Sequence, residues 1–167
     1  MINKNFAGEI GIDFNDIKDK LDENDKEMVE AISSCPQTTA ELFKQTEFRA
    51  AYKEIMRYAS IGNTYLEKTA PWSLIKNGDI ESAKKVLYLC LNMAKSLAIV
   101  GSPIMPTKTA EIWEQLGFDR RPDENGRWIE ASKIDVTKTH KINSPKPLFM
   151  RLDDETIERY KKELEAK

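Results

Sequence analysis

The chain has 167 residues, of which 40% are hydrophobic and 32% charged, and its formal net charge is −2. A chain of this length can bury a core without disulfides or metals, and its composition is that of a globular domain with a charged surface. The weak negative charge excludes a protein that holds nucleic acid through a global basic field, so any contact with RNA must be local.

The apolar segments are too short and too interrupted for a membrane span. The longest, residues 86–100, contains an asparagine, a lysine and a serine, whereas a span needs about 20 apolar residues. No signal-like sequence follows Met1. We therefore expect a cytoplasmic protein whose partners include neither a membrane nor DNA. Cys35 and Cys90 stand alone in the sequence and predict no metal site.

Apolar residues recur mostly at intervals of three and four, which predicts helices. A first amphipathic helix is expected over residues 15–34. It should end at Cys35–Pro36, because a proline disfavours helical angles in the residue before it. Thr38 and Glu41 have the spacing of a capping box and predict a second, long helix that runs to about Thr69.

A corner is predicted after this long helix. Pro71 interrupts the chain, residues 72–75 form a short helical turn, and Asn77-Gly78 closes that turn. Asp79 is placed to cap a further helix over residues 80–100. The second half of that helix is apolar nearly all round, which is typical of the buried centre of a bundle.

The chain beyond this central helix is punctuated by glycine and proline. Gly101 is expected to stop the central helix, and Thr107 to cap a helix that ends at Leu116-Gly117. Residues 118–127 then form a polar loop.

An extended segment over residues 127–152 is predicted to wrap the bundle, because it lacks helical periodicity. A charged helix over residues 153–167, capped by Asp153 or Asp154, should end the chain. The predicted fold is thus all-α: one domain, residues 1–167, built as a helix bundle of about five or six helices with an extended C-terminal wrap and a final helix.

The sequence contains no pattern typical of catalysis. His140 is the only histidine and lies in a lysine-rich stretch, no nucleophile has a base at a fixed spacing, and no glycine-rich loop could hold a phosphate. We therefore predict no catalytic residue, no metal and no cofactor bound by this chain.

The most informative segment is NTYLEKTAPWSLI, from Asn63 to Ile75. Trp72 follows a proline at the junction of two predicted helices. The ring could fill the corner as a core residue, or a rigid proline could present it to solvent, where an unpaired base can stack on it. Trp113 is expected in the core, and Trp128 is expected to fix the extended segment to the bundle.

Several segments, in order along the chain, resemble methionyl-tRNA synthetases. Residues 63–72 match the N-x-Y-x-x-x-x-A-P-W stretch of that family. Further matches are residues 2–6 (INKNF), 103–106 (PIMP), 109–113 (TAEIW, one residue shorter than in the family), 140–142 (HKI), 145–149 (PKPLF) and 151–153 (RLD). The resemblance thus runs from one end of the chain to the other.

The resemblance implies an anticodon-binding domain and assigns roles to single residues. Trp72 would stack on the first anticodon base, and Pro71 would shape the approach to it. Lys4, in the opening INKNF, would lie close to the anticodon, and Asn63 is a candidate whose role could equally be structural. The family's base-reading Asn and Arg lie upstream of INKNF and have no counterpart here.

The same resemblance implies two partners, the anticodon loop of the methionine tRNA and the catalytic domain of the same enzyme. The HIGH and KMSKS signatures of that catalytic domain are missing. ATP and methionine would therefore bind the catalytic domain, and this chain should not join methionine to tRNA alone. Basic residues of the loop and wrap could add phosphate contacts; these are Arg120, Arg121, Lys133, Lys138 and Lys141.

Two alternatives stay open. The chain could be the anticodon-binding domain of another class I synthetase, or it could be a helical protein-interaction module in which Trp72 belongs to the core. An anticodon stem-loop distinguishes the second alternative, because only a stacking Trp72 should lose fluorescence when the loop binds.

Overall fold

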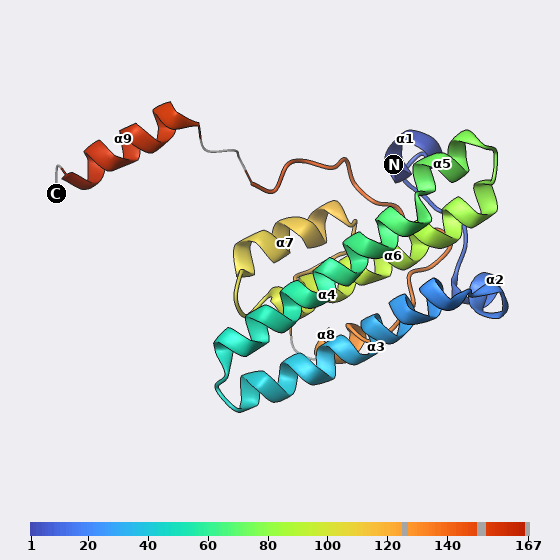
Figure 1. Ribbon diagram of the computed structural model, residues 1–167, viewed down its shortest axis with the longest axis horizontal. Coiled ribbons are helices and arrows are strands. Elements are labelled where there is room, and N and C mark those ends of the chain that lie inside the picture. The colour runs from blue at the N-terminus through green and yellow to red at the C-terminus, as the bar shows by residue number, and fades with distance from the viewer. Residues whose placement is uncertain (125–126, 150–152, 166–167) are drawn as a thin grey trace.

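A computed structural model describes residues 1–124, 127–149 and 153–165 of the chain. The fold is all-α, as predicted, and Figure 1 shows three long helices lying side by side. These are α3 (Glu23–Lys44), α4 (Phe48–Thr69) and α6 (Ile80–Gly101), which pack against one another in all three pairings.

The central position of α6 follows from its sequence. Its second half carries apolar side chains all round, and residues from Val86 to Gly101 are buried with few exceptions. The larger of them are fully enclosed, Tyr88 and Leu89 at 0% exposure. Burial of side chains of this size is the main favourable contribution to the stability of the bundle. This confirms the helix predicted from residue 80 as the core of the fold.

The first predicted helix is wrong in its boundaries. Residues 15–34 do not form one helix: α2 (Phe14–Ile17) and the 3-10 turn η1 (Lys18–Lys20) come first, and the chain is extended at Leu21. Asp22 then caps α3, accepting a hydrogen bond from the backbone N–H of Asp25. The side chain of Asp25 reaches back to the N–H of Asp22, so the first turn of α3 is stabilised by a capping box.

The predicted break at Cys35–Pro36 is also wrong, because α3 continues through Pro36 to Lys44. Thr38 is therefore not a helix cap; its hydroxyl donates to the carbonyl of Ser34 one turn earlier. Pro36 is buried, and its missing N–H leaves one helical hydrogen bond unmade. Both halves of α3 pack against the bundle, and that burial outweighs the local cost of the proline. The chain turns instead at Gln45–Glu47, before α4.

The helix after α6 begins one residue before its predicted cap. Gly101 is the last residue of α6, and Ser102 follows as its C-cap with right-handed helical angles. Helix α7 (Pro106–Gln115) starts with Pro106 in its first turn and Met105 as N-cap, so Thr107 does not cap it. A proline fits that first position because its fixed φ suits the helix and no N–H is needed there.

The predicted wrap is partly helical at its start. Residues 127–130 form the short helix α8 (Arg127–Glu130), and the next described residues of the wrap, 131–149, are irregular chain with turns at 131–132 and 138–139. Tyr88 of α6 donates to the carbonyl of Val136 at 3.1 Å, and Trp128 donates to the carbonyl of Pro36 at 2.8 Å. The prediction that Trp128 fixes this segment to the bundle is confirmed.

The end of the wrap crosses the bundle very closely. A Cβ on Gly117 would lie 2.0 Å from the carbonyl oxygen of Lys141, and Gly117 has φ +78°. Just beyond, Ile142 donates to the carbonyl of Gly8 at 2.9 Å, and an isolated antiparallel bridge pairs Glu9 with Lys141. The late wrap thus holds the opening residues of the chain.

The final helix, α9 (Asp154–Glu165), stands apart from the bundle in Figure 1. Asp153 caps it, accepting from the N–H of Thr156 at 2.8 Å, as predicted. The ends of the predicted segments, residues 150–152 and 166–167, lie outside the described residues. No helix within the described residues has the length and apolar character needed to cross a membrane.

Candidate nucleic-acid interface

The corner between α4 and α5 (Pro71–Lys76) is built on Ala70. Ala70 has left-handed angles, φ 41° and ψ 61°, and serves as the C-cap of α4 and the N-cap of α5. Its N–H donates to the carbonyl of Leu66 at 3.1 Å, and its carbonyl accepts from Ser73 at 2.8 Å. Pro71 cannot continue α4 but suits the first position of a new helix. The APW sequence therefore dictates the sharp change of direction.

The ring of Trp72 lies on the outside of this corner. Its exposure is 49%, whereas its neighbour Pro71 is buried and Leu74 packs against the core. Pro71 and Leu74 thus fix the short helix to the core, while the indole of Trp72 faces solvent. Of the two arrangements that the sequence left open for Trp72, the structure has the exposed ring beside a buried proline.

The other two tryptophans are engaged within the protein. Trp113 is 1% exposed, and its indole N–H donates to the carbonyl of Asp119 at 3.0 Å. The indole N–H of Trp128 donates to Pro36, and its ring meets Phe43 edge-on at 6.0 Å. In both, the indole N–H donates a hydrogen bond within the protein, which is the usual arrangement for a buried tryptophan with a structural role.

Lys4 lies at the same end of the molecule as Trp72. It is exposed on α1 (Ile2–Phe6), and Figure 1 shows α1 and α5 at one end of the bundle. Asn3 anchors α1 by donating to the carbonyl of Asn143 at 3.0 Å. This dependence of α1 on the wrap could not be seen in the sequence, because the two segments are separated by 140 residues.

Asn63 is exposed on α4, seven residues before Ala70, which places it about 10 Å back along the helix axis. The structure therefore brings Pro71, Trp72 and Lys4 to one end of the bundle and sets Asn63 farther along its side.

Three of the cations predicted to contact phosphate are already paired, and the longest of these pairs joins Arg120 to Glu124 at 3.8 Å. Arg121 contacts Asp123 at 2.9 Å, and Lys138 contacts Asp16 at 2.8 Å. The hydrogen bond from Lys138 lowers the pKa of Asp16, and the one from Arg121 lowers the pKa of Asp123. Each charge is thus matched locally, which reduces the attraction of these side chains for a phosphate.

His140 has a structural position. Its Nε2 atom lies 2.7 Å from the carbonyl oxygen of Leu116, and its ring stacks on Phe118 with centroids 4.4 Å apart. Phe118 in turn contacts Trp113 at 4.5 Å. The imidazole therefore joins an aromatic stack between α7 and the wrap.

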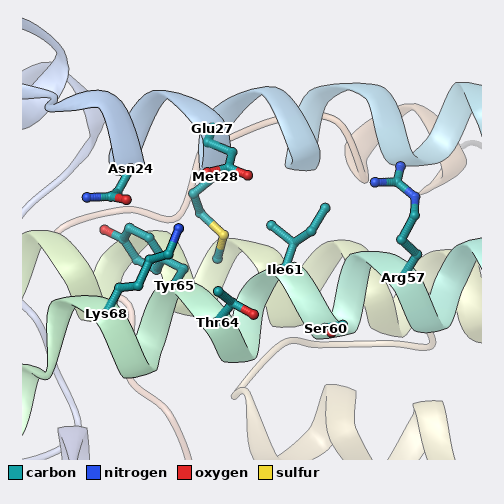
Figure 2. A pocket seen from close by; sticks show the side chains of 9 residues that line it. All are labelled: Asn24, Glu27, Met28, Arg57, Ser60, Ile61, Thr64, Tyr65 and Lys68. Carbon is teal, nitrogen blue, oxygen red and sulfur yellow. The ribbon is translucent and has the colours of Figure 1, made fainter.

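A groove of about 190 Å³ runs between α3 and α4, and Figure 2 shows the side chains that line it. Its lining is mixed in charge and polarity: Asn24, Glu27, Met28, Arg57, Ser60, Ile61, Thr64, Tyr65 and Lys68. Lys68 lies at the end of α4 that leads to the corner, and Arg57 lies toward the far end of the groove. Arg57 is paired with Glu54 at 2.7 Å.

A buried polar cluster lies beside this groove, which the sequence alone did not reveal. Asp25 of α3 is 0% exposed and accepts a hydrogen bond from the hydroxyl of Tyr65 of α4 at 2.6 Å. Lys85 of α6 contacts the same carboxylate at 2.5 Å. Burial, and then the bond to Asp25, raises the pKa of Tyr65 far above its usual range. The phenol is therefore a permanent donor.

Comparison with known proteins gives a consistent result. Residues 18–167 match the family model described as the anticodon binding domain of methionyl tRNA ligase. The chain is 35% identical over 147 residues to a methionine–tRNA ligase of Saccharolobus islandicus, which covers 88% of this chain and 25% of that protein. It is 38% identical over 141 residues to that of Methanobrevibacter smithii, covering 84% of this chain and 20% of that one.

A solved structure has the same fold. The chain superposes on apo methionyl-tRNA synthetase of Mycobacterium tuberculosis with a TM-score of 0.78 at 20% identity, covering 92% of this chain and 30% of that one. The chain thus spans about a quarter of the length of the curated relatives that it matches.

Proposed function

The chain belongs to the family of anticodon-binding domains of methionyl-tRNA ligase, and from this premise we propose that it binds the anticodon loop of a methionine tRNA, with an unpaired base stacked on Trp72. Single-stranded loops are the RNA elements whose bases are free to be read in this way. The relatives named methionine–tRNA ligase are about four times as long as this chain. The proposal for this chain therefore concerns recognition of the tRNA and not the ligase reaction.

The observation that carries the stacking proposal is the contrast between Trp72 and the other tryptophans. Trp72 is 49% exposed at a corner supported by a buried proline, whereas Trp113 and Trp128 are held inside by hydrogen bonds. An exposed indole on a rigid support loses little conformational entropy when a base stacks on it. Such a contact contributes about 1–3 kcal/mol per base.

The net charge of −2 fits a stacking contact better than a broad ionic one. Lys4, exposed at the same end of the bundle, is the proposed phosphate contact nearest to the loop. Asn63 stands farther from the corner and is proposed as a contact to a neighbouring nucleotide. With Lys4 and the basic residues of the loop and wrap as phosphate contacts, we expect the affinity of the isolated domain to be weak and to depend strongly on salt.

In the full-length enzyme we propose that a separate catalytic domain binds ATP and methionine and joins methionine to the tRNA. The domain described here would hold the anticodon end so that the acceptor end reaches that site. The interaction then contributes through orientation rather than chemistry.

The test is a titration of a CAU anticodon stem-loop, at low salt, against the wild-type domain and Trp72→Ala. Tyr52→Ala is a matched control, because Tyr52 is also a half-exposed aromatic side chain (44%) but lies in the first turns of α4, far from the corner. We expect Trp72→Ala to weaken binding about tenfold or more, Tyr52→Ala to leave it unchanged, and circular dichroism to show intact helices in both.

The reverse result has a clear meaning. If Trp72→Ala binds the CAU loop as well as the wild type does, stacking on this ring is refuted. If the wild-type domain binds CAU and scrambled loops equally, recognition does not reside in this chain, and the role of a protein-interaction module gains support.

A further inference from the structure

The C-terminal half of α4 has one buried side chain, that of Tyr65, and the partly buried Ile61 packs against the core one turn earlier. The buried residues of α4 are Ala51, Ile55, Tyr58 and Tyr65. Nearly two helical turns separate Tyr58 from Tyr65, and the residues after Tyr65 are half-buried or exposed up to the corner. Tyr65 is therefore the last buried side chain of α4 before Ala70 turns the chain toward Trp72.

The anchor of Tyr65 is a buried carboxylate with three donors. Oδ1 of Asp25 accepts from the Tyr65 hydroxyl at 2.6 Å. Oδ2 contacts the ammonium of Lys85 at 2.5 Å and accepts from the N–H of Asp22 at 3.0 Å. Figure 2 shows Tyr65 leaving α4 toward α3. One carboxylate thus fixes the start of α3, the second turn of α6 and the end of α4 relative to one another.

The anchor also connects to the corner through the backbone. The Tyr65 carbonyl accepts from the hydroxyl of Thr69 at 2.7 Å, and Ala70 donates to Leu66 at 3.1 Å. These bonds make the last turn of α4 rigid. A displacement at Tyr65 is therefore carried into the left-handed turn at Ala70 and the short helix that bears Trp72.

We propose that Tyr65 is a positioning residue for RNA recognition: its hydroxyl, held by Asp25, sets the place and orientation of the Trp72 ring at the end of the bundle. This inference rests on the proposed function. Tyr65 touches no RNA in it and acts only through the end of α4.

Tyr65→Phe tests this proposal because it removes the hydroxyl and keeps the ring. Tyr88→Phe is the matched control. Tyr88 is also fully buried, and its hydroxyl donates to the carbonyl of Val136 at 3.1 Å, but it joins α6 to the wrap and not α4 to α3. The two variants lose the same atom from equally buried sites, so a general loss of packing should affect both alike.

Two readouts separate positioning from stability. The first is the affinity for the CAU stem-loop, measured where both variants are fully folded. The second is the 19F NMR spectrum of protein containing 5-fluorotryptophan, with the Trp72 resonance assigned by Trp72→Phe. We expect Tyr65→Phe to weaken binding by about five- to tenfold and to shift or broaden the Trp72 resonance. Tyr88→Phe should leave both unchanged.

The proposal is overturned if Tyr65→Phe and Tyr88→Phe bind the stem-loop equally and the Trp72 resonance is the same in both. Failure of the proposed function would look different. In that case Trp72→Ala would bind as the wild type does, while the Trp72 resonance would still respond to Tyr65→Phe and not to Tyr88→Phe.

Discussion

The ammonium of Lys95, in the middle of the central helix α6, forms an ion pair with the carboxylate of Asp135 in the extended wrap. The side chain of Lys95 is 4% exposed and also donates to the carbonyl of Lys133 at 3.0 Å, whereas that of Asp135 is 53% exposed. A buried cation in the core of the bundle is thus neutralised by a segment about 40 residues later in the chain.

The first prediction follows from this asymmetry in exposure. Asp135→Asn leaves the Lys95 ammonium buried without its counter-charge, and we expect the free energy of unfolding to fall by about 1–3 kcal/mol. Lys95→Met removes the cation itself and should change stability by less than about 1 kcal/mol. Urea unfolding of both variants measures the difference. Equal losses would show that the pair acts symmetrically and contradict this account.

The second prediction concerns the close crossing at Gly117. Gly117→Ala combines a left-handed backbone with a Cβ 2.0 Å from the carbonyl oxygen of Lys141, so we expect a loss of about 3 kcal/mol or more. Gly78→Ala is the control, since Gly78 has φ +81° with nothing within 4 Å of a new Cβ. It should cost about 1 kcal/mol. Thermal unfolding of the two variants measures both losses of stability. Gly78→Ala gives the cost of the left-handed backbone alone, and the additional loss in Gly117→Ala gives the cost of the clash.

The third prediction uses the left-handed Ala70. Ala70→Gly should stabilise the domain by about 0.5–1 kcal/mol, because glycine adopts these angles without strain. Ala59→Gly, the same change within the helical part of α4, should destabilise by about 1 kcal/mol. Urea midpoints that move in the same direction for both variants would refute strain at Ala70.

The fourth prediction concerns the two thiols. Burial raises the pKa of Cys35 and of Cys90 to about 12 from an ordinary value of 9.0. Both should therefore react slowly with a water-soluble thiol reagent near pH 8 and quickly once the protein unfolds. Rapid labelling of the native protein would contradict the burial of Cys35 and the partial burial of Cys90.

The same shifts give a direction for the pH dependence of stability. The folded protein holds the thiol protons more tightly than the unfolded chain does. The resulting contribution to the free energy of unfolding is present in full below about pH 9 and is lost as the pH rises toward about 12. We expect the free energy of unfolding to decline over that interval. The variant carrying both Cys35→Ala and Cys90→Ala should show a smaller decline between about pH 9 and pH 12.

The corner at Trp72 was predictable because its signals are local. Pro71, Asn77-Gly78 and Asp79 act on their own backbone, and the structure confirms a helix that ends before Pro71, a short helix closed at Asn77 and a helix capped by Asp79. The exposure of Trp72 needed the structure, since a tryptophan in such a corner can face either way.

The path of α3 through Pro36 could not be predicted, because the interactions that keep this helix continuous are not local. The local cost of a proline inside a helix is of the order of 3 kcal/mol, and the sequence shows only that cost. The compensation comes from tertiary burial, with Ile32 and Cys35 both at 0% exposure against the bundle. In the same way, the cluster of Asp25, Tyr65 and Lys85 joins residues from three helices and leaves no pattern in any one of them.

The bonds between the opening residues and the late wrap have a consequence for the order of folding during synthesis. Asn3, Gly8 and Glu9 leave the ribosome before their partners near Ile142, which follow only after the long helices have been made. At a few to about 20 residues per second, that interval lasts many seconds. Helices α3, α4 and α6 can assemble first, and α1, which carries Lys4, is the last part of this end of the bundle to be fixed.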